Sequence, residues 1–241
     1  MNILITGHSA GLGKALMRVL KLNGHSVYGI SRSASGEVEN ECICNFSDLG
    51  IARKIIPQYL AAIPNLDYVI LNAGMLGDIT HCRKLSVEQI DYVMRVNVYS
   101  NKITIDALLQ REAHCKTIIG ISSGAALAPK FGWLQYCLTK GAFKMLIETY
   151  ACEESSIKFL SVAPGIIKTR MQEKILKVDA NEIPSVKKFH DMYPNMDTAE
   201  VIAKHVFEFL FTCENYESGD FVDLRNIGKL PTVDGYLNKI Q

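Results

Sequence analysis

The fold is decided near the amino terminus, by the stretch Ile3-Leu4-Ile5-Thr6-Gly7-His8-Ser9-Ala10-Gly11-Leu12-Gly13. It opens with an apolar run typical of a buried strand, and an amphipathic pattern follows, with Leu12, Leu16 and Leu20 on one helical face. The intervening glycines are spaced G-x-x-x-G-x-G. Glycines let a backbone approach a pyrophosphate, which the start of the following helix attracts with free N–H groups and its dipole. The stretch predicts a dinucleotide-binding turn; the alternative is a glycine turn needed only for packing.

The remaining chain repeats this alternation of strand and helix. Short runs rich in Ile and Val predict seven strands: Ile3–Thr6, Val27–Ile30, Cys42–Cys44, Tyr68–Leu71, Thr117–Ile121, Phe159–Val162 and Phe221–Leu224. Amphipathic stretches separate them. One opens at a capping box at Ser86 and runs toward Glu112, and we expect Pro57 to cut another short. The alternation predicts an α/β fold with a doubly wound, mostly parallel sheet and helices on both faces. At 241 residues, we expect a single domain spanning 1–241.

Composition excludes several classes of protein. The formal net charge is only +1, so no bulk attraction to nucleic acid or to an anionic membrane follows. The seven cysteines are scattered, and no His–Cys cluster indicates a metal site, so we expect reduced thiols in a cytoplasmic protein. We find no targeting signal and no apolar run of about 18 residues that could span a membrane.

The second predicted strand ends in Ser31-Arg32-Ser33. In dinucleotide-binding folds an acid near this point binds the adenosine ribose, whereas an arginine accommodates a 2′-phosphate. This chain has the arginine and lacks the acid, which favours NADP(H) over NAD(H); the alternative is a solvated surface arginine. Asn72-Ala73-Gly74 closes the fourth strand, where small residues let the backbone pass close to a ligand or another chain segment.

Tyr136 and Lys140 lie four residues apart in a helical pattern, so their side chains share one face. A phenol has a pKa of about 10, and a nearby cation lowers it by about 1–3 units. Ser123 ends the fifth strand, where its hydroxyl can donate to a carbonyl oxygen. These three residues predict proton exchange with a carbonyl or alcohol substrate.

Taken in order, these motifs resemble the short-chain dehydrogenase/reductase family, single-domain type. The matching elements are Thr6-Gly7-x-x-x-Gly11-x-Gly13, Asn72-Ala73-Gly74, Asn97, Ser123, Tyr136-x-x-x-Lys140 and Pro164-Gly165-x-x-x-Thr169. The resemblance implies a Rossmann-like sheet and hydride transfer between a nicotinamide cofactor and a small carbonyl or alcohol.

The resemblance also implies roles for individual residues. Tyr136 is the general acid or base, Lys140 lowers its pKa, Ser123 positions the substrate, and Asn97 holds a water that relays protons. The implied cofactor-binding residues are Gly7, Ser9, Gly11, Leu12, Gly13, Arg32, Asn45, Phe46, Asn72, Ala73, Gly74, Tyr136, Lys140, Pro164, Gly165, Ile167 and Thr169. Two departures concern the cofactor. Asn45 stands where the family often has an aspartate, and Ala10 stands where NADP-dependent members often carry a base.

Two further expectations concern the surface. The segment 165–197 shows little periodicity and follows the sixth strand, so we expect a substrate lid there. The stretches Asp91–Leu109 and Tyr136–Ala151 carry more apolar residues than one helical face needs, which favours a homodimer or homotetramer.

Two other functions are alternatives to a reductase. A nucleotide-sugar isomerase or lyase of the family's longer branch usually has a larger carboxyl-terminal domain. A non-catalytic dinucleotide-binding regulator would be favoured by loss of Ser123, Tyr136 or Lys140, and all three are present.

Overall fold

A computed structural model describes residues 1–38, 40–111 and 114–227. Its centre is one seven-stranded sheet in which every pairing is parallel, as predicted. The strand order is β3 (Glu41–Ile43), β2 (Ser26–Ser31), β1 (Asn2–Thr6), β4 (Leu66–Leu71), β5 (Cys115–Ile121), β6 (Lys158–Ala163) and β7 (Phe221–Asp223). The order reverses between β1 and β4, and such a switch point is where open α/β sheets bind ligands.

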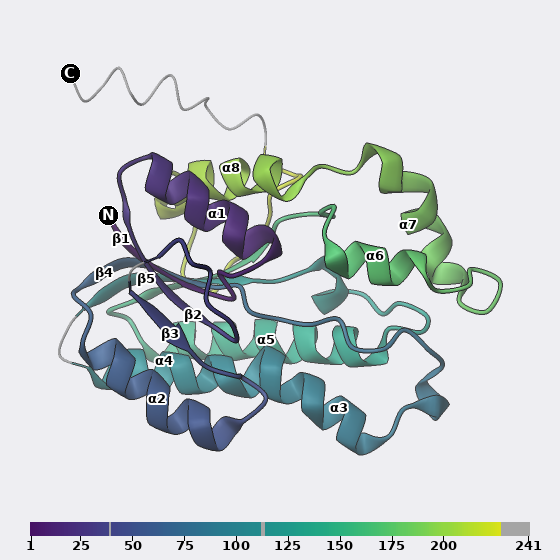
Figure 1. Ribbon diagram of the computed structural model, residues 1–241, viewed down its shortest axis with the longest axis horizontal. Coiled ribbons are helices and arrows are strands. Elements are labelled where there is room, and N and C mark those ends of the chain that lie inside the picture. The colour runs from purple at the N-terminus through teal and green to yellow at the C-terminus, as the bar shows by residue number, and fades with distance from the viewer. Residues whose placement is uncertain (39, 112–113, 228–241) are drawn as a thin grey trace.

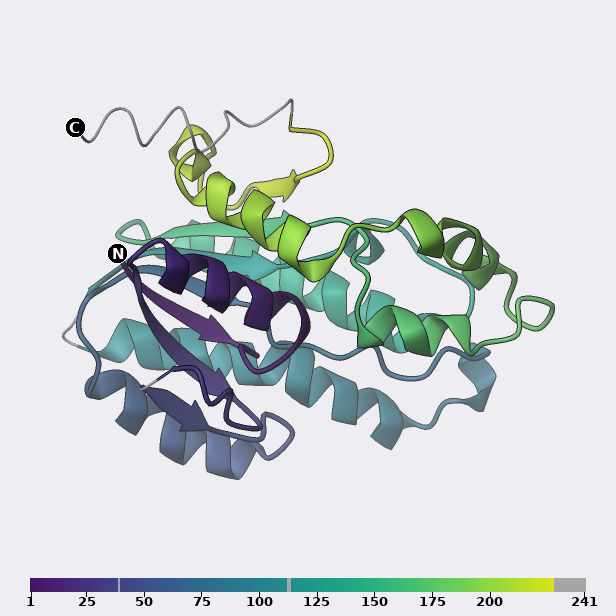
Figure 2. The same ribbon diagram turned by 45° about the horizontal axis from the view of Figure 1, so that its top comes forward.

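Helices cover both faces of the sheet (Figures 1 and 2). On one face, α1 (Gly11–Leu22) packs against α8 (Ala199–Leu210). The other face is covered by α2 (Leu49–Ala61), α4 (Ser100–Gln110) and α5 (Leu134–Glu153). Each face has its own apolar core, so the inner strands are buried on both sides. None of the described helices is long and apolar enough to cross a membrane.

The expected break at Pro57 is wrong, because α2 continues through this proline to Ala61. Ile56 and Leu60, on either side of it, are both fully buried in the core beneath the helix. Burying two such side chains contributes about 3–6 kcal/mol, which offsets the roughly 3 kcal/mol that an internal proline costs a helix.

The helix expected from Ser86 toward Glu112 is interrupted by a π-helical turn, which periodicity does not reveal. The capping box of Ser86 opens α3 (Val87–Met94), a π-helical turn follows at Arg95–Tyr99, and α4 then ends at Gln110. Glu112 lies outside the described residues. The wide turn contains Asn97, and such π-turns often occur at functional sites.

The segment after β6 is more regular than predicted. It holds two short helices, α6 (Arg170–Leu176) and α7 (Lys187–Met192), which extend beyond the sheet's carboxyl edge (Figure 2). Its apolar side chains form a small separate core with Trp133: Ile175, Ile183, Val186, Phe189 and Met196. Two short helices with a shared core explain why no long period is visible in the sequence.

Candidate active site

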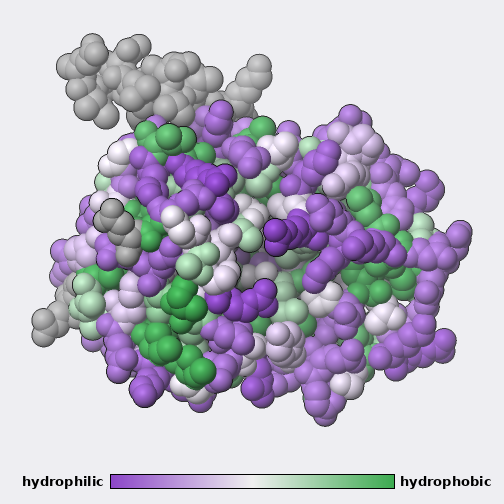
Figure 3. All heavy atoms as spheres, viewed as in Figure 1, coloured by the Kyte–Doolittle hydropathy of each residue, from purple (hydrophilic) through white to green (hydrophobic). Residues whose placement is uncertain are grey.

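A cleft of about 980 Å³ lies along the carboxyl edge of the sheet. Its walls come from the ends of β1, β2, β4, β5 and β6, together with α5, α6 and α7. Figure 3 shows a hollow near the middle of the molecule, with hydrophilic side chains to its right and below it. Among parallel-sheet proteins this edge is the usual ligand site.

The glycine turn forms one end of the cleft. Gly7 and Gly11 adopt φ angles of +70° and +53°, which other residues rarely reach. Gly13 lies so close to the turn that a Cβ atom there would be 2.3 Å from the carbonyl oxygen of Gly7. The first turn of α1 has no acidic residue, and no side chain caps it at Ala10. Its N–H groups therefore face the cleft as an anion-binding end.

Asn72 and Ala73 support this turn from the neighbouring strand. The hydroxyl of Thr6 accepts hydrogen bonds from the backbone N–H groups of Asn72 and Ala73, both at 3.0 Å. The Asn72 amide donates to the carbonyl oxygens of Thr6 at 3.0 Å and Gly7 at 3.3 Å. The motif that closes β4 thus fixes the backbone of the glycine turn.

The end of β2 carries no carboxylate at the expected ribose position. The Ser31 hydroxyl donates instead to the carbonyl oxygen of Ser33 at 2.6 Å, and the Ser33 hydroxyl lies 3.3 Å from that of Ser9. Arg32 is exposed and lines the cleft. The Asn45 side-chain oxygen accepts hydrogen bonds from the N–H and the hydroxyl of Ser47, so only its amide nitrogen is left for a ligand.

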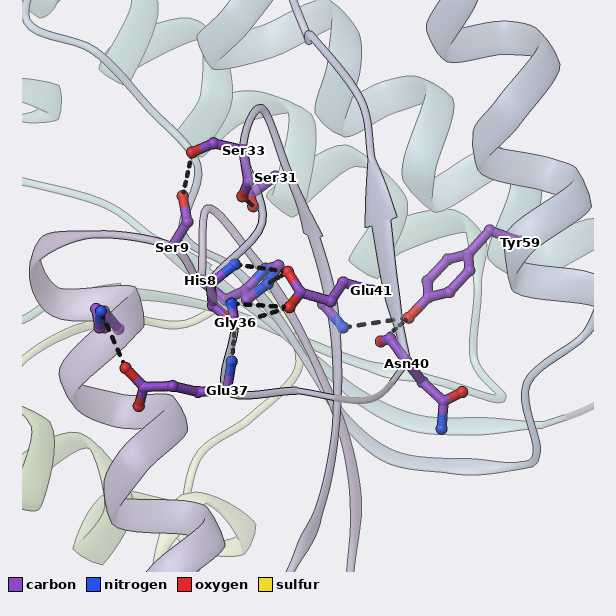
Figure 4. Close-up of polar contacts among 12 residues, drawn as sticks. His8, Ser9, Ser31, Ser33, Gly36, Glu37, Asn40, Glu41 and Tyr59 are labelled. Atoms are coloured by element: carbon purple, nitrogen blue, oxygen red, sulfur yellow. Dashed lines mark hydrogen bonds and ion pairs between the residues drawn. The ribbon is translucent and has the colours of Figure 1, made fainter.

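A polar pair with a buried histidine lies beneath this end of the cleft, and sequence reasoning missed it (Figure 4). His8 is completely buried, and its Nε2 atom lies 2.9 Å from a carboxylate oxygen of Glu41. The same carboxylate accepts hydrogen bonds from the N–H and the hydroxyl of Ser35, at 2.8 and 2.9 Å. The pair therefore connects the glycine turn, β3 and the loop after β2. The two residues are 33 positions apart, so no local pattern could have paired them.

The chemical end of the cleft brings Ser123, Tyr136 and Lys140 together. Burial raises the pKa of the Tyr136 phenol, and a side-chain hydrogen bond with Ser123 partly offsets this. The Lys140 ammonium lies 5.8 Å from the centre of the Tyr136 ring and donates to the carbonyl oxygen of Ile121 at 2.7 Å. Burial lowers the pKa of Lys140 to about 8.

Asn97 lies directly behind this group and is buried. Its side-chain oxygen accepts from the N–H of Met75 at 2.8 Å, and its amide donates to the carbonyl of Met75 at 2.8 Å. The Asn97 carbonyl accepts a hydrogen bond from the amide of Asn101 at 2.8 Å. A Cβ atom at Gly74 would lie 3.5 Å from the Asn97 side-chain oxygen and 3.8 Å from the Lys140 ammonium. Gly74 therefore lies close to both side chains.

The loop after β6 closes the far wall. Gly165 adopts a φ of +97°, and Thr169 precedes α6. A Cβ atom at Gly11 would lie 3.8 Å from the Thr169 methyl group, so this loop meets the glycine turn.

Most predicted site residues line the cleft. They are Gly7, Ser9, Gly11, Leu12, Arg32, Asn45, Phe46, Asn72, Ala73, Gly74, Ser123, Tyr136, Lys140, Pro164, Gly165, Ile167 and Thr169. Gly13 and Asn97 are not among the lining residues; they lie behind the wall that the others form. Lys130 and Arg225 line the cleft but were missed. Arg225 directly follows the last predicted strand, so the rule that ligands bind at the carboxyl edge could have identified it.

These residues fit a nicotinamide dinucleotide. The uncapped start of α1 and the close glycine packing leave room for a pyrophosphate, and no acidic residue is among the described side chains that line the cleft. Side chains for proton transfer stand at the opposite end from Arg32, which directly follows β2.

Comparison with known proteins agrees with this geometry. The chain belongs to the short-chain dehydrogenase family: the family model described as "short chain dehydrogenase" matches residues 1–179. It is therefore an oxidoreductase of the class that transfers hydride between a nicotinamide dinucleotide and carbonyl or alcohol substrates.

Individual relatives are similar over most of the chain. A benzil reductase ((S)-benzoin forming) of Bacillus cereus is 26% identical and aligns with 91% of this chain and 97% of its own. The sepiapterin reductase of Rattus norvegicus is 30% identical, over 70% of this chain and 75% of its own. Among solved structures, the KRED1-Pglu enzyme superposes with a TM-score of 0.79 and 25% identity, covering 92% of this chain and 100% of the other.

Proposed function

We propose that this protein is an NADP(H)-preferring reductase or dehydrogenase of small carbonyl or alcohol substrates, with Tyr136 as its general acid and base. The observation that carries the proposal is the convergence of Ser123, Tyr136 and Lys140 at one end of a cleft whose other end is the glycine turn. Each side chain has a part in moving one proton.

Tyr136 donates its phenolic proton to the substrate oxygen in reduction and accepts it in oxidation. Burial alone makes the phenol a weaker acid, as the raised pKa indicates. To exchange a proton near neutral pH, the phenol needs a shift of about three units, worth about 4 kcal/mol. The Ser123 hydrogen bond acts in the required direction, and so does positive charge on Lys140.

Ser123 orients the substrate oxygen toward Tyr136 and donates to the negative charge that develops on it. Lys140 is held in place by the carbonyl oxygen of Ile121, so its ammonium group is fixed beside the Tyr136 ring. Asn97 keeps the Met75 backbone in position, and we propose that it holds a water that passes protons to Lys140. When bound, the dinucleotide supplies or accepts the hydride.

The cofactor residues follow from the same cleft. The start of α1, with Gly7, Ser9, Gly11, Leu12 and Gly13, binds the pyrophosphate. Arg32 binds a 2′-phosphate on the adenosine side, because it is exposed, lines the cleft and has no acidic residue beside it at Ser31. Contacts to the rest of the dinucleotide come from Asn45, Phe46, Asn72, Ala73, Gly74, Pro164, Gly165, Ile167 and Thr169.

The segment 165–197, with α6 and α7, forms the substrate wall that faces Tyr136. Trp133 joins it to the catalytic helix, since its indole N–H donates to the hydroxyl of Ser185 at 2.9 Å. We include it in a single catalytic domain; of the proposed span 1–241, residues 228–241 lie outside the described part.

Turnover measured with NADPH and NADH over a panel of ketones tests the proposal. Benzil belongs in this panel because three of the relatives are benzil reductases. The matched variant is Tyr136→Phe, which removes one oxygen atom. We expect turnover to fall at least about 10²–10⁴-fold, as for a lost general acid. Near-normal turnover by the variant would contradict the assignment of Tyr136 as the general acid. Absence of turnover by the unmodified protein would contradict the proposed reductase activity.

A further inference from the structure

The charge of the cleft is one-sided. Among the described residues, eight lysine or arginine side chains line it and no aspartate or glutamate does. The whole chain carries a net charge of only +1, so this imbalance is local. The eight cations are Lys14, Arg32, Lys130, Lys140, Arg170, Lys174, Lys188 and Arg225. A cleft lined by one sign of charge concentrates ligands of the opposite sign.

The dinucleotide accounts for part of this charge. Lys14 lies on α1 and pairs with Glu37 at 3.0 Å, and Arg32 directly follows β2. Arg170 and Lys174 lie on α6, whose first residues follow Thr169 at the glycine turn. Lys140 belongs to the catalytic group. Three cations of the cleft are therefore not assigned to the phosphates of a dinucleotide: Lys130, Lys188 and Arg225, of which Arg225 pairs with Asp223.

Lys130 and Lys188 flank an aromatic wall next to Tyr136. The Lys130 carbonyl accepts from the N–H of Trp133 at 3.1 Å, and the Trp133 ring centre lies 6.1 Å from that of Tyr136. The Trp133 and Phe189 ring centres are 5.1 Å apart, and the Lys188 ammonium stands 5.2 Å from the centre of the Phe189 ring. Both lysines thus belong to the substrate end.

Their charges are close and uncompensated. Burial lowers the pKa of Lys130, the Cys137 thiol acts in the opposite direction, and the positive charges of Lys188 and Arg225 lower it further, so both cations lie within electrostatic reach of Lys130. In the described part of the chain, the nearby ion pairs join Lys187 to Asp191 and Arg225 to Asp223, and none includes Lys130 or Lys188. Cations that repel one another around an apolar pocket are stabilised when an anion binds between them.

We propose that the substrate carries an anionic group, a carboxylate or a phosphate, which Lys130 and Lys188 bind. Its apolar body packs on Trp133 and Phe189, and its carbonyl or hydroxyl group faces Tyr136. The inference rests on the proposed function and adds the class of substrate. Lys130 and Lys188 are specificity determinants, since neither exchanges a proton with the reacting carbon or oxygen.

Matched probes test the inference without requiring turnover. Calorimetry on protein saturated with oxidised dinucleotide, which blocks the phosphate sites of the cofactor, compares phenylglyoxylate with its neutral methyl ester. We expect the acid to bind about ten-fold more tightly, as for one charge-assisted hydrogen bond. Phenyl phosphate is the second anionic probe; tighter binding than phenylglyoxylate indicates a phosphate substrate, and weaker binding a carboxylate.

The variants are Lys130→Gln with Lys188→Gln, and Lys187→Gln as the control. Lys187 lies on α7 next to Lys188, is exposed and does not line the cleft. The double variant should lose most of the preference for the acid over the ester, and the control should keep it. Equal affinity for acid and ester, failure to bind either anionic probe, or an equal loss in the control overturns the inference.

Reduction of the methyl ester, measured in parallel, separates this inference from the proposed function. If the protein reduces the ketone of the methyl ester but does not bind the acid more tightly than the ester, only the inference of an anionic substrate is contradicted. Anion binding lost in the double variant, in a protein that reduces no carbonyl, supports the anion site and contradicts the proposed function.

Discussion

The side-chain amide of Asn97 donates to the hydroxyl of Thr139 at 3.0 Å, and both groups are buried. This bond joins the π-helical turn to the helix that carries Tyr136 and Lys140. Neither residue type is unusual in a helix, and the two lie 42 positions apart. The helix that carries Tyr136 and Lys140 is thereby held against the π-helical turn that contains Asn97.

Thr139→Val should weaken this connection while keeping the shape of the side chain. The variant loses the bond from Asn97 and also the bond that the Thr139 hydroxyl donates to the carbonyl oxygen of Tyr136 at 3.2 Å within the helix. From the loss of the Asn97 bond, worth about 1 kcal/mol, we expect kcat to fall about five-fold while the Kd for the dinucleotide stays within two-fold. The control is Thr149→Val, which removes a hydroxyl that donates to Met145 at the far end of the same helix. Steady-state kinetics and calorimetry measure the two quantities. An equal fall in kcat in both variants would contradict the positioning role.

Arg32→Ala should reduce the preference for NADPH over NADH. A hydrogen bond to a charged group contributes about 1.5–3 kcal/mol, and because Arg32 is exposed we expect the lower end, about ten-fold in Kd. Calorimetric titration with each dinucleotide measures the preference, which should also narrow as salt is added. Arg53→Ala, on the outer helix α2, is the control and should change neither Kd. Tighter binding of NADH by the unmodified protein would show that Arg32 does not select the cofactor.

The buried Lys140 makes stability depend on pH in a defined window. Its pKa in the folded protein is lowered to about 8 from 10.5, so the unfolded chain binds more protons between these values. The stabilisation is therefore present above about pH 10.5 and is lost as the pH falls toward 8. Relative to Lys140→Met, the free energy of unfolding of the unmodified protein should rise by on the order of 3 kcal/mol from pH 8 to 10.5. Urea unfolding of both proteins measures the difference; a pH-independent difference would contradict the lowered pKa.

Gly29→Ala should destabilise the protein through one named contact. A Cβ atom at Gly29 would lie 2.4 Å from the ring of His8, which is buried and bound to Glu41. Such overpacking costs about 1–3 kcal/mol. His8→Ala removes the ring, so the double variant should be less destabilised than the two single variants added together. Thermal or urea unfolding of the unmodified protein and the three variants measures this coupling. If the losses in free energy of unfolding of the two single variants add up to that of the double variant, the predicted clash with His8 is contradicted.

The exposed apolar surface on which the expected oligomer depends is smaller than the sequence indicated. Val93, Phe143 and Ile147, which contributed to the apparent surplus, are buried in the core of their own chain. Leu138 and Met145 on α5 remain 47% and 61% exposed. We expect light scattering to find a dimer or tetramer, and Leu138→Glu with Met145→Glu to convert it to monomer. Leu22→Glu, on α1, is the control; a monomeric unmodified protein contradicts the prediction.

The sheet could be predicted because its information is local. Runs such as Ile3–Thr6 and Phe159–Val162 are short, mostly apolar and without alternation, which is the pattern of a strand buried on both faces. Pro57 was misjudged for the opposite reason. The local cost of proline is evident in the sequence, whereas the burial of Ile56 and Leu60 that offsets it depends on the packed sheet.

The candidate site was predictable where function depends on a spacing within one element. The glycine turn and the Tyr136–Lys140 pair are of this kind, and both line the cleft. The bond between His8 and Glu41, the π-helical turn around Asn97, and the approach of Lys130 to Lys188 are not. The His8–Glu41 bond, the bond between Met75 and the Asn97 of that turn, and the Lys130–Lys188 approach each join residues from different elements, and their proximity exists only after the chain has folded.

Trp133 packs between Tyr136 and Phe189 and is the only tryptophan in the chain. All indole emission of this protein therefore comes from the wall of the cleft, within reach of both proposed ligands. A reduced nicotinamide absorbs where indole emits, so its arrival quenches that light by energy transfer, and a substrate seated on the ring alters it separately. The molecule thus contains its own optical reporter, and stopped-flow recordings of unlabelled protein can time the order in which cofactor and substrate bind.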